Sequence, residues 1–189
     1  MRRLSALFLV LSLSLTLPAL AADTYTADPA HSSVGFKIKH MGLSTVRGQF
    51  TEYTGKVSFD KEDPTKSSVE VIVQAKSIDT ANSMRDAHLR KADFFNVEKF
   101  PTLSFKSTAV KKIDDATYEI TGNFTLLGVS KPVTFQFVDV AFGKGPQGDD
   151  RAGGNARFKI NRSDYGMTKS VGPGSETVEI ELAFEAVKS

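Results

Sequence analysis

The chain has 189 residues, enough for one domain with a substantial hydrophobic core. It contains no cysteine, which excludes both a disulfide framework and an acylated cysteine. Its 24 basic and 22 acidic residues nearly balance and are interleaved, so a nucleic acid is not an expected partner.

Residues 1–21 are predicted to be a signal peptide. Arg2 and Arg3 precede an apolar, serine-rich run over residues 4–17, and an Ala-Leu-Ala cleavage sequence ends the segment. The apolar run is shorter than a transmembrane helix needs, so no membrane span is expected. Removing the two arginines makes the counts of basic and acidic residues equal. We therefore expect a periplasmic protein whose mature domain is residues 22–189.

Alternating apolar and polar residues predict strands along most of the remaining chain. In the first half the alternation covers residues 34–39, 46–59 and 69–75. A turn is expected at Gly42, and a polar turn is expected at residues 60–66. Each of these strands has one apolar face, so each is expected to be half-buried.

A helical pattern interrupts the strands at residues 84–91. Ser83 and Asp86 have the spacing of a capping box, although the acidic position of that motif is usually Glu or Gln. A helix of about two to three turns is too short to be stable alone, so it must dock on the rest of the fold. Pro101 suits the entry to the next strand, because Pro can occupy the first position of a strand.

The alternation resumes in the second half of the chain. Residues 143–154 are rich in glycine and are predicted to form the longest loop. This segment matches G-x-G-x-x-G, but it contains a proline and no helical pattern follows, so it does not indicate a dinucleotide site. The later strands are predicted to begin at Leu103 and to cover residues 118–126, 133–137, 158–160 and 178–186.

About eight closely spaced strands are typical of an antiparallel β-sandwich or β-barrel. Closure into a barrel would remove exposed strand edges. An eight-stranded barrel is wide enough either to fill its interior with side chains or to hold one small ligand. The pattern of strands leaves both outcomes open.

Several motifs, in this order and spacing, resemble the YceI-like family of lipid- or polyisoprenoid-binding proteins. The resemblance extends from about Tyr25 to Val187. Any one motif is a weak signal, whereas the set is specific. The motifs are Asp-Pro-Ala-His-Ser-Ser-Val-Gly-Phe at 28–36 followed by His40, Ser-Ile-Asp-Thr at 77–80, Arg-Asp-Ala-His-Leu at 85–89, Asp-Phe-Phe at 93–95, Phe-Pro-Thr-Leu-Ser-Phe at 100–105, Gly-Asn-Phe-Thr-Leu-Leu-Gly at 122–128 and Lys-Pro-Val at 131–133.

The resemblance implies a mainly β domain over residues 22–189: a single eight-stranded antiparallel lipocalin-like barrel with a short helix near its mouth. It implies an apolar channel that takes a long-chain isoprenoid or similar lipid, and it suggests a homodimer. It implies no catalytic activity, and we expect neither an enzyme nor a cofactor. Inward-facing residues are predicted to line the channel. They are Phe36, Ile38, Phe59, Val71, Val73, Leu103, Phe105, Ile120, Phe124, Phe135, Phe137, Phe158, Ile180, Leu182 and Phe184.

Five polar residues are candidates for contacts with a lipid head group at the mouth. The spacing of the histidines matches no zinc pattern, so no metal site is expected. Arg85 is the strongest candidate for a phosphate, because a guanidinium can bind it bidentately. The favoured interpretation of Arg85 and Asp86 is nevertheless an ion pair that fixes the helix against the barrel. The five candidates are His31, His40, Arg85, Asp86 and His88.

Two other functions remain open from the sequence. A lipid-modifying enzyme could use Arg85, Asp86 and His88 as its active cluster, although no G-x-S-x-G sequence and no cysteine nucleophile are present. A barrel filled by its own side chains could instead act through its surface as a stress or interaction protein.

Overall fold

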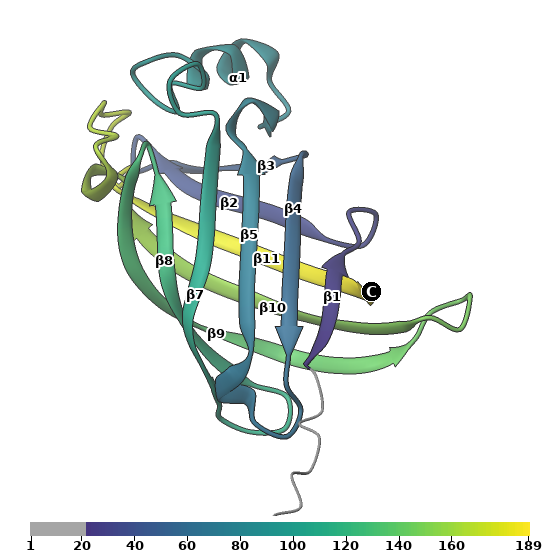
Figure 1. The fold of residues 1–189 in the computed structure, drawn as a ribbon. Coiled ribbons are helices and arrows are strands. Elements are labelled where there is room, and N and C mark those ends of the chain that lie inside the picture. Colours follow the sequence, from purple (N-terminus) through teal and green to yellow (C-terminus); the bar gives the residue numbers. More distant parts are fainter. Residues whose placement is uncertain (1–21) are drawn as a thin grey trace, which may run out of the picture.

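The computed structural model describes residues 22–189, which form eleven strands and one α-helix (Figure 1). The predicted signal peptide lies outside the described residues. No helix within residues 22–189 is long and apolar enough to cross a membrane. Helix α1 spans Ser83–Leu89, and short 3-10 helices cover Pro64–Lys66, Ala75–Ser77 and Arg162–Tyr165. The strands are β1 (Asp23–Ala27), β2 (Ser33–His40), β3 (Ser44–Phe50), β4 (Tyr53–Phe59), β5 (Ser68–Gln74), β6 (Ile78–Asp79), β7 (Thr102–Lys112), β8 (Tyr118–Leu126), β9 (Val129–Lys144), β10 (Asp150–Asn161) and β11 (Thr177–Lys188).

These strands form one antiparallel sheet that closes on itself. Strand β1 pairs with β4 on one side and with β11 on the other. The closed ring runs β1-β4-β5-β7-β8-β9-β10-β11 and has eight strands, which confirms the predicted eight-stranded antiparallel barrel. Closure gives each strand of this ring a partner on both sides, so the ring has no free edge.

Three of the eight positions in the barrel are each occupied by two consecutive strands with an interruption between them. This is why eleven strands form an eight-stranded barrel. Strands β1 and β2 follow each other along β11, where their partners end at Ala186 and resume at Ala183. Residues 28–32 form the interruption. Strand β3 leads into β4 in the same way, and β5 leads into β6, since Phe50 of β3 pairs with Ile78 of β6.

The sequence pattern fails at two short elements, strand β1 and the N-terminus of α1. It does not predict β1, because this five-residue strand buries only Tyr25 and shows no clear alternation. The predicted capping box of α1 is wrong. Asn82 is the N-cap residue, and its side-chain oxygen accepts a hydrogen bond of 3.0 Å from the Arg85 backbone N–H. Asp86 is therefore free to bond elsewhere.

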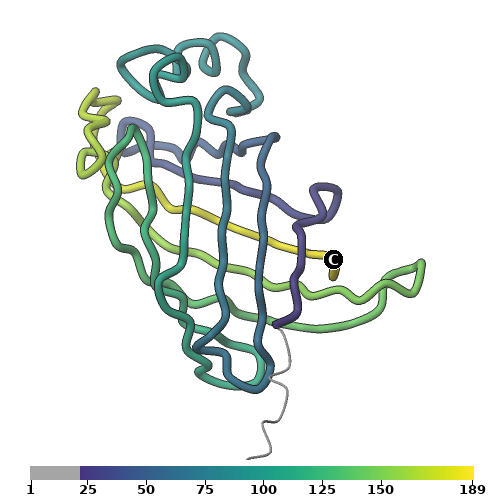
Figure 2. Tube along the Cα trace, viewed as in Figure 1, coloured from purple at the N-terminus to yellow at the C-terminus, as the bar shows by residue number. Residues whose placement is uncertain are grey.

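The predicted long loop at residues 143–154 is also wrong. Strands β9 and β10 extend into this segment, and residues 145–149 alone connect them, so that the hairpin projects from the side of the barrel (Figure 2). Gly154 lies within β10, where a Cβ atom would come within 2.5 Å of the Phe137 ring. Glycine is present there because it makes room for an aromatic ring, and not because the chain turns.

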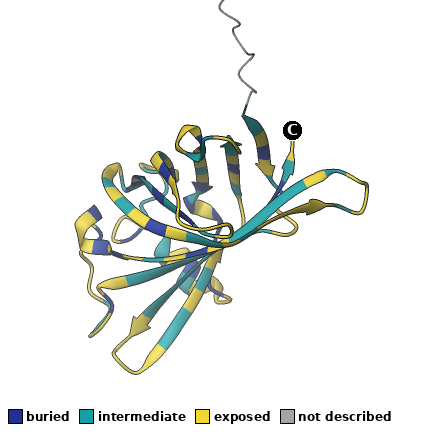
Figure 3. Ribbon diagram, turned by 90° about the horizontal axis from the view of Figure 1, so that it is seen from below, coloured by how far each residue is buried: buried dark blue, intermediate teal, exposed yellow. Residues whose placement is uncertain are grey.

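Buried and exposed residues alternate along the strands, which is the pattern of a sheet with one face turned inward (Figure 3). Strand β8 illustrates it: Ile120, Phe124 and Leu126 are buried, and Asn123 is exposed. The buried residues form a core cluster that also includes Phe94, which follows α1 in the chain. The interior of the barrel is therefore apolar.

Helix α1 and residues 90–101 lie at one end of the barrel, as the family resemblance implies (Figure 1). Arg90 holds them there by donating hydrogen bonds from Nε to the Lys76 carbonyl (2.7 Å) and from Nη2 to the Ile78 carbonyl (2.9 Å). We call this the α1 end of the barrel. It contains the helix, residues 90–101, the β2–β3 turn and residues 166–176.

Candidate functional site

The barrel encloses a cavity of about 430 Å³. Its lining extends from Phe142 of β9 to His88 of α1, so it reaches the α1 end. The volume falls within the range of about 300–1,000 Å³ that is common for ligand pockets. Side chains therefore do not fill the barrel, which removes the main premise of the filled-barrel alternative.

All fifteen residues that the sequence predicts for the channel line this cavity, although their contact with a ligand stays a prediction. Their side chains belong to strands from every part of the chain, and the period of two along each strand turns them inward. They are Phe36, Ile38, Phe59, Val71, Val73, Leu103, Phe105, Ile120, Phe124, Phe135, Phe137, Phe158, Ile180, Leu182 and Phe184.

The prediction omits several other residues of the cavity wall. Val34 and Tyr118 lie in register with the predicted inward faces, so the alternation of their strands could have found them. Phe94 and Phe95 reach the cavity from the irregular segment after α1. No periodicity indicates the direction of a side chain in such a segment, so their place on the wall depends on the tertiary fold.

Aromatic rings form much of the wall. The rings of Phe135 and Phe158 stack with centroids 4.8 Å apart, and Phe105 lies 5.3 Å from Phe135. Phe124 meets Tyr165 edge-on at 5.5 Å. Phenylalanine rings offer dispersion contacts and no hydrogen-bonding group, so this part of the wall suits a hydrocarbon.

The cavity-facing residues of β11 are less buried than the cavity-facing residues of β8. Ile180, Leu182 and Phe184 line the cavity, yet each is only partly buried. Their remaining accessible surface faces the open interior of the barrel. An apolar ligand would cover this surface and gain the free energy of removing it from water.

Three of the five polar candidates line the cavity, namely His40, Arg85 and His88. His40 ends β2, and the ring of His88 packs edge-on against Phe94 at 5.0 Å. His31 and Asp86 are not among the residues that line the cavity, so for these two a contact with a head group stays a prediction that the cavity does not support. Each of these two has partners outside it.

Asp86 fixes α1 to the barrel through Thr80. Asp86 is buried, and its Oδ1 accepts hydrogen bonds from the Thr80 backbone N–H (2.9 Å) and from Thr80 Oγ1 (2.5 Å). Arg85 donates from Nε to Thr80 Oγ1 (2.7 Å) and from Nη2 to the Thr80 carbonyl (2.6 Å). The expected direct ion pair is therefore replaced by a network around Thr80. Because Asp86 does not face the cavity, the three residues do not converge there as an enzyme cluster would.

His31 belongs to an ion network in the β1–β2 connection. Its Nδ1 lies 2.9 Å from Asp28 Oδ2. Arg151 Nη1 donates to Asp28 Oδ2 at 2.9 Å and to Glu185 Oε1 at 2.5 Å. Asp28, His31 and Glu185 have the spacing of a metal site, with their ligand atoms within 4.8 Å of one another. The Arg151 guanidinium already supplies the positive charge, so the cluster is an ion-pair network that closes the interrupted strand.

This network predicts acid sensitivity. The hydrogen bond with His31, assisted by the Ala30 backbone N–H and by Arg151, lowers the pKa of Asp28 to about 2 from its usual 3.8. The stabilisation from Asp28 is therefore present above pH 3.8 and is lost as the pH falls through about 2. We expect the melting temperature of Asp28→Asn to fall less than that of the wild type between these pH values. Parallel slopes in a thermal-melting series would contradict the assignment.

His31 contributes in the opposite sense. Its hydrogen bond to Asp28 raises the pKa of the imidazole above 6.5. Its contribution is therefore fully present below pH 6.5 and is lost as the pH rises through the folded-state value. The same melting series on His31→Ala, extended above neutral pH, separates the two effects.

Apart from tyrosine, the ionisable residue types among those that line the cavity are basic, but Lys39 and Lys56 alternate with inward-facing neighbours and are exposed. No Asp or Glu of residues 22–189 lines the cavity. Lys56 lies in β4, away from the others, which belong to the α1 end or border it. The basic residues that line the cavity are Lys39, His40, Lys56, Arg85, His88 and Arg162.

Arg162 is the most deeply buried of these basic residues, at 4% exposed, and burial lowers the pKa of its guanidinium. Its Nε donates to the Ser175 carbonyl (2.6 Å) and its Nη2 to the Lys169 carbonyl (2.5 Å). These bonds hold residues 166–176 against the end of β10. Lys169 also pairs with Asp93 at 3.5 Å, which connects this segment to the residues after α1.

A closed eight-stranded barrel with an apolar interior cavity and a short helix at one end defines a lipocalin-like ligand-binding barrel. Residues 25–186 match the family model described as a YceI-like domain. The chain is also 43% identical over 172 residues to a UPF0312 protein of Ectopseudomonas mendocina (strain ymp), covering 90% of each chain. The chain belongs to the YceI-like family.

Solved structures agree with this assignment. A crystal structure of the Campylobacter jejuni YceI protein is similar with a TM-score of 0.72 and 33% identity, covering 86% of this chain and 96% of that one. A polyisoprenoid binding domain from Saccharophagus degradans has a TM-score of 0.66 at 13% identity, covering 87% and 98% of the two chains. At that identity the second comparison establishes a shared fold.

Proposed function

We propose that this protein binds a long-chain isoprenoid or related lipid inside its barrel and carries it through the periplasm. The observation that carries the proposal is the cavity, which is apolar along its length and basic at the α1 end. The family membership and the shared fold with a polyisoprenoid binding domain support the same ligand class.

The energetics favour a hydrocarbon chain. Burial contributes about 0.8 kcal/mol per CH₂ group, so a chain of some tens of carbons gains more gross free energy than the roughly 18–21 kcal/mol at which affinities saturate. Ordering a flexible chain offsets part of this gain. Affinity is therefore readily available, and selectivity must come from the ends of the ligand.

The basic residues define the kind of head group that fits. A head that carries anionic or strongly accepting oxygens would meet Arg85, His88 and His40 at the α1 end, with no carboxylate on the described wall to repel it. Both Arg85 hydrogen bonds to Thr80 use Nε and Nη2, which leaves Nη1 for a ligand. We infer that the tail occupies the aromatic interior and the head lies beneath α1.

The periplasmic location and the homodimer belong to this proposal. The signal peptide predicted at residues 1–21 supports export. A homodimer is the expectation from the family resemblance. Cell fractionation and light scattering on the purified protein test these two points directly.

Native extraction tests the ligand. The protein should be purified without detergent from cells that express the full chain, extracted with organic solvent and analysed by mass spectrometry. We expect about one long-chain lipid per barrel, because a barrel of this size holds one ligand. Repeatedly empty extracts, together with no uptake of an added prenol, would falsify the proposal.

A variant that narrows the cavity provides a second readout. Leu182→Trp adds bulk on the inward face of β11, where space is open, so we expect the fold to persist while prenol uptake falls severalfold. Glu181→Trp places the same side chain at the neighbouring position on the opposite face of the strand and should leave uptake unchanged. Equal uptake by both variants would mean that the lipid binds elsewhere.

A further inference from the structure

The large apolar side chains with the greatest exposure gather at the α1 end. Among residues 22–189, Leu43 is 87% exposed, Met84 is 81% exposed and Met41 is 51% exposed. The other exposed large apolar residues, such as Ile113 at 46% and Ile72 at 39%, lie on strands or at the opposite turn and are less exposed. Single exposed apolar residues are ordinary, but these three share one end of the molecule.

The segments that carry these side chains lie at the end of the barrel where the cavity wall reaches α1. Met41 and Leu43 belong to the β2–β3 turn, next to His40 of the cavity wall. That turn meets residues 166–176, since a Cβ atom on Gly172 would lie 2.4 Å from Met41 Sδ. Met84 is in the first turn of α1, next to Arg85 of the wall. The apolar side chains therefore lie at the same end of the cavity.

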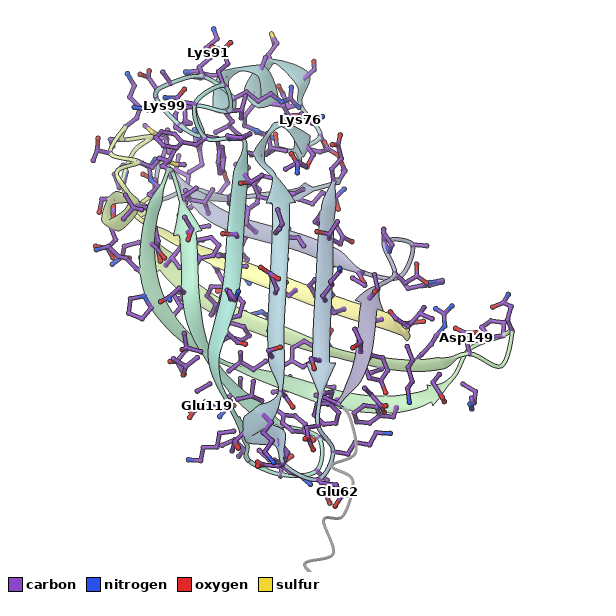
Figure 4. All side chains as sticks on the ribbon, viewed as in Figure 1. Glu62, Lys76, Lys91, Lys99, Glu119 and Asp149 are labelled. Carbon is purple, nitrogen blue, oxygen red and sulfur yellow. The ribbon has the colours of Figure 1, made fainter. Side chains whose placement is uncertain are left out.

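The charge of the molecule differs between its two ends. Lys76, Lys91 and Lys99 lie at the α1 end, whereas Glu62 and Glu119 lie at the opposite end (Figure 4). The basic residues of the cavity mouth add to the positive charge of the α1 end. The connections at the opposite end, residues 60–67 and 111–119, contain six acidic and four basic residues, whereas the α1 end contains five basic and four acidic residues.

We propose that the α1 end docks on the surface of an anionic lipid bilayer, with Leu43, Met84 and Met41 inserted among the head groups and acyl chains. Exposed apolar side chains next to basic residues are the combination that favours such an interface. In this position the cavity mouth faces the membrane, so a lipid can pass between bilayer and barrel without crossing water. The transfer of a lipid between bilayer and barrel rests on the proposed lipid binding, whereas the docking of the α1 end on the bilayer does not.

Vesicle sedimentation tests the docking. The probes are vesicles of phosphatidylcholine alone and vesicles of phosphatidylcholine with phosphatidylglycerol. We expect the purified mature protein to sediment with the anionic vesicles and to be released by high salt. The double variant Leu43→Asp/Met84→Asp should bind these vesicles at least about tenfold more weakly than the wild type, since it replaces two inserted side chains with carboxylates.

A matched control separates this surface from general surface effects. Ile72→Asp/Ile113→Asp makes the same chemical change at exposed positions away from the α1 end, and it should bind like the wild type. Absence of wild-type binding, or equal losses in both double variants, overturns the proposal. The proposal is also overturned if the exposed apolar side chains join two copies of the chain. In that case the wild type would be a dimer that does not bind vesicles, and Leu43→Asp/Met84→Asp would dissociate it.

Prenol uptake distinguishes a failure of docking from a failure of the proposed function. The prenol is delivered by dilution from ethanol, without vesicles. We expect the Leu43→Asp/Met84→Asp variant to take it up as well as the wild type does, because neither residue lines the cavity. A wild type that sediments with vesicles but takes up no prenol retains the docking surface and contradicts lipid carriage. Reduced uptake by the variant from solution contradicts a role confined to docking.

Discussion

Replacing Phe124 with Asp should leave the barrel mostly unfolded at physiological temperature. Phe124 is 8% exposed, lines the cavity and packs edge-on against Tyr165 and Phe158. Loss of a buried Phe side chain costs about 3–5 kcal/mol, and an unpaired carboxylate in an apolar interior adds several more. This sum approaches the whole stability of a typical domain, about 5–15 kcal/mol. Urea and thermal denaturation followed by circular dichroism measure the loss.

Two further variants make this result specific. Asn123→Asp places the same acid at the neighbouring, exposed position of β8 and should change the melting temperature little. Phe124→Leu keeps the site apolar and should fold, so it can be tested for lipid uptake. Full uptake and unchanged melting of Phe124→Asp would mean that the inner and outer faces of β8 are assigned wrongly.

Asp86→Ala should release α1 from the barrel and destabilise the protein by about 2–3 kcal/mol, since it removes the acceptor of two buried hydrogen bonds. The Thr80 backbone N–H and hydroxyl would lose their partner, and the adjacent Arg85 would lose a neighbouring negative charge. Hydrogen exchange should show faster exchange at residues 80–101 than in the strands of the barrel. Chemical denaturation gives the global change.

Asp86→Asn is the informative comparison. Its amide oxygen can still accept a hydrogen bond from Thr80, so we expect a smaller loss than for Asp86→Ala. Asp93→Ala, on the exposed side of the same region, should cost less than about 1 kcal/mol, because it removes only a surface ion pair with Lys169. Exchange at α1 that is unchanged in Asp86→Ala would show that the Asp86–Thr80 bonds do not hold the helix.

The faces of the strands could be predicted well because a strand repeats every two residues. Along β8, for example, the alternation of Ile120 and Phe124 with Thr121 and Asn123 is enough to say which side chains share a face. It is also why the predicted channel residues all lie on one cavity wall. The pattern gives the face but not what the face encloses, so it could not decide between a filled and an open barrel.

Residues outside the alternation were predicted less well. The glycine-rich pattern predicts a loop at Gly154, since glycine is common in turns, whereas glycine is needed there because the Phe137 ring of another strand lies close. Residue type alone groups His31 and Asp86 with His40 and Arg85. Their real partners, Arg151 for the His31 network and Thr80 for Asp86, are set by how the chain closes.

The sequence by itself determined the mainly β class, the inward faces, the helix and the family, because these depend on local periodicity and on the order of motifs. Only the tertiary structure decided that three barrel positions are interrupted, that a cavity of about 430 Å³ stays open and that basic residues line it at the α1 end. These properties arise when side chains distant in sequence meet across a closed ring. No local pattern encodes the diameter of that ring or the neighbours that it brings together.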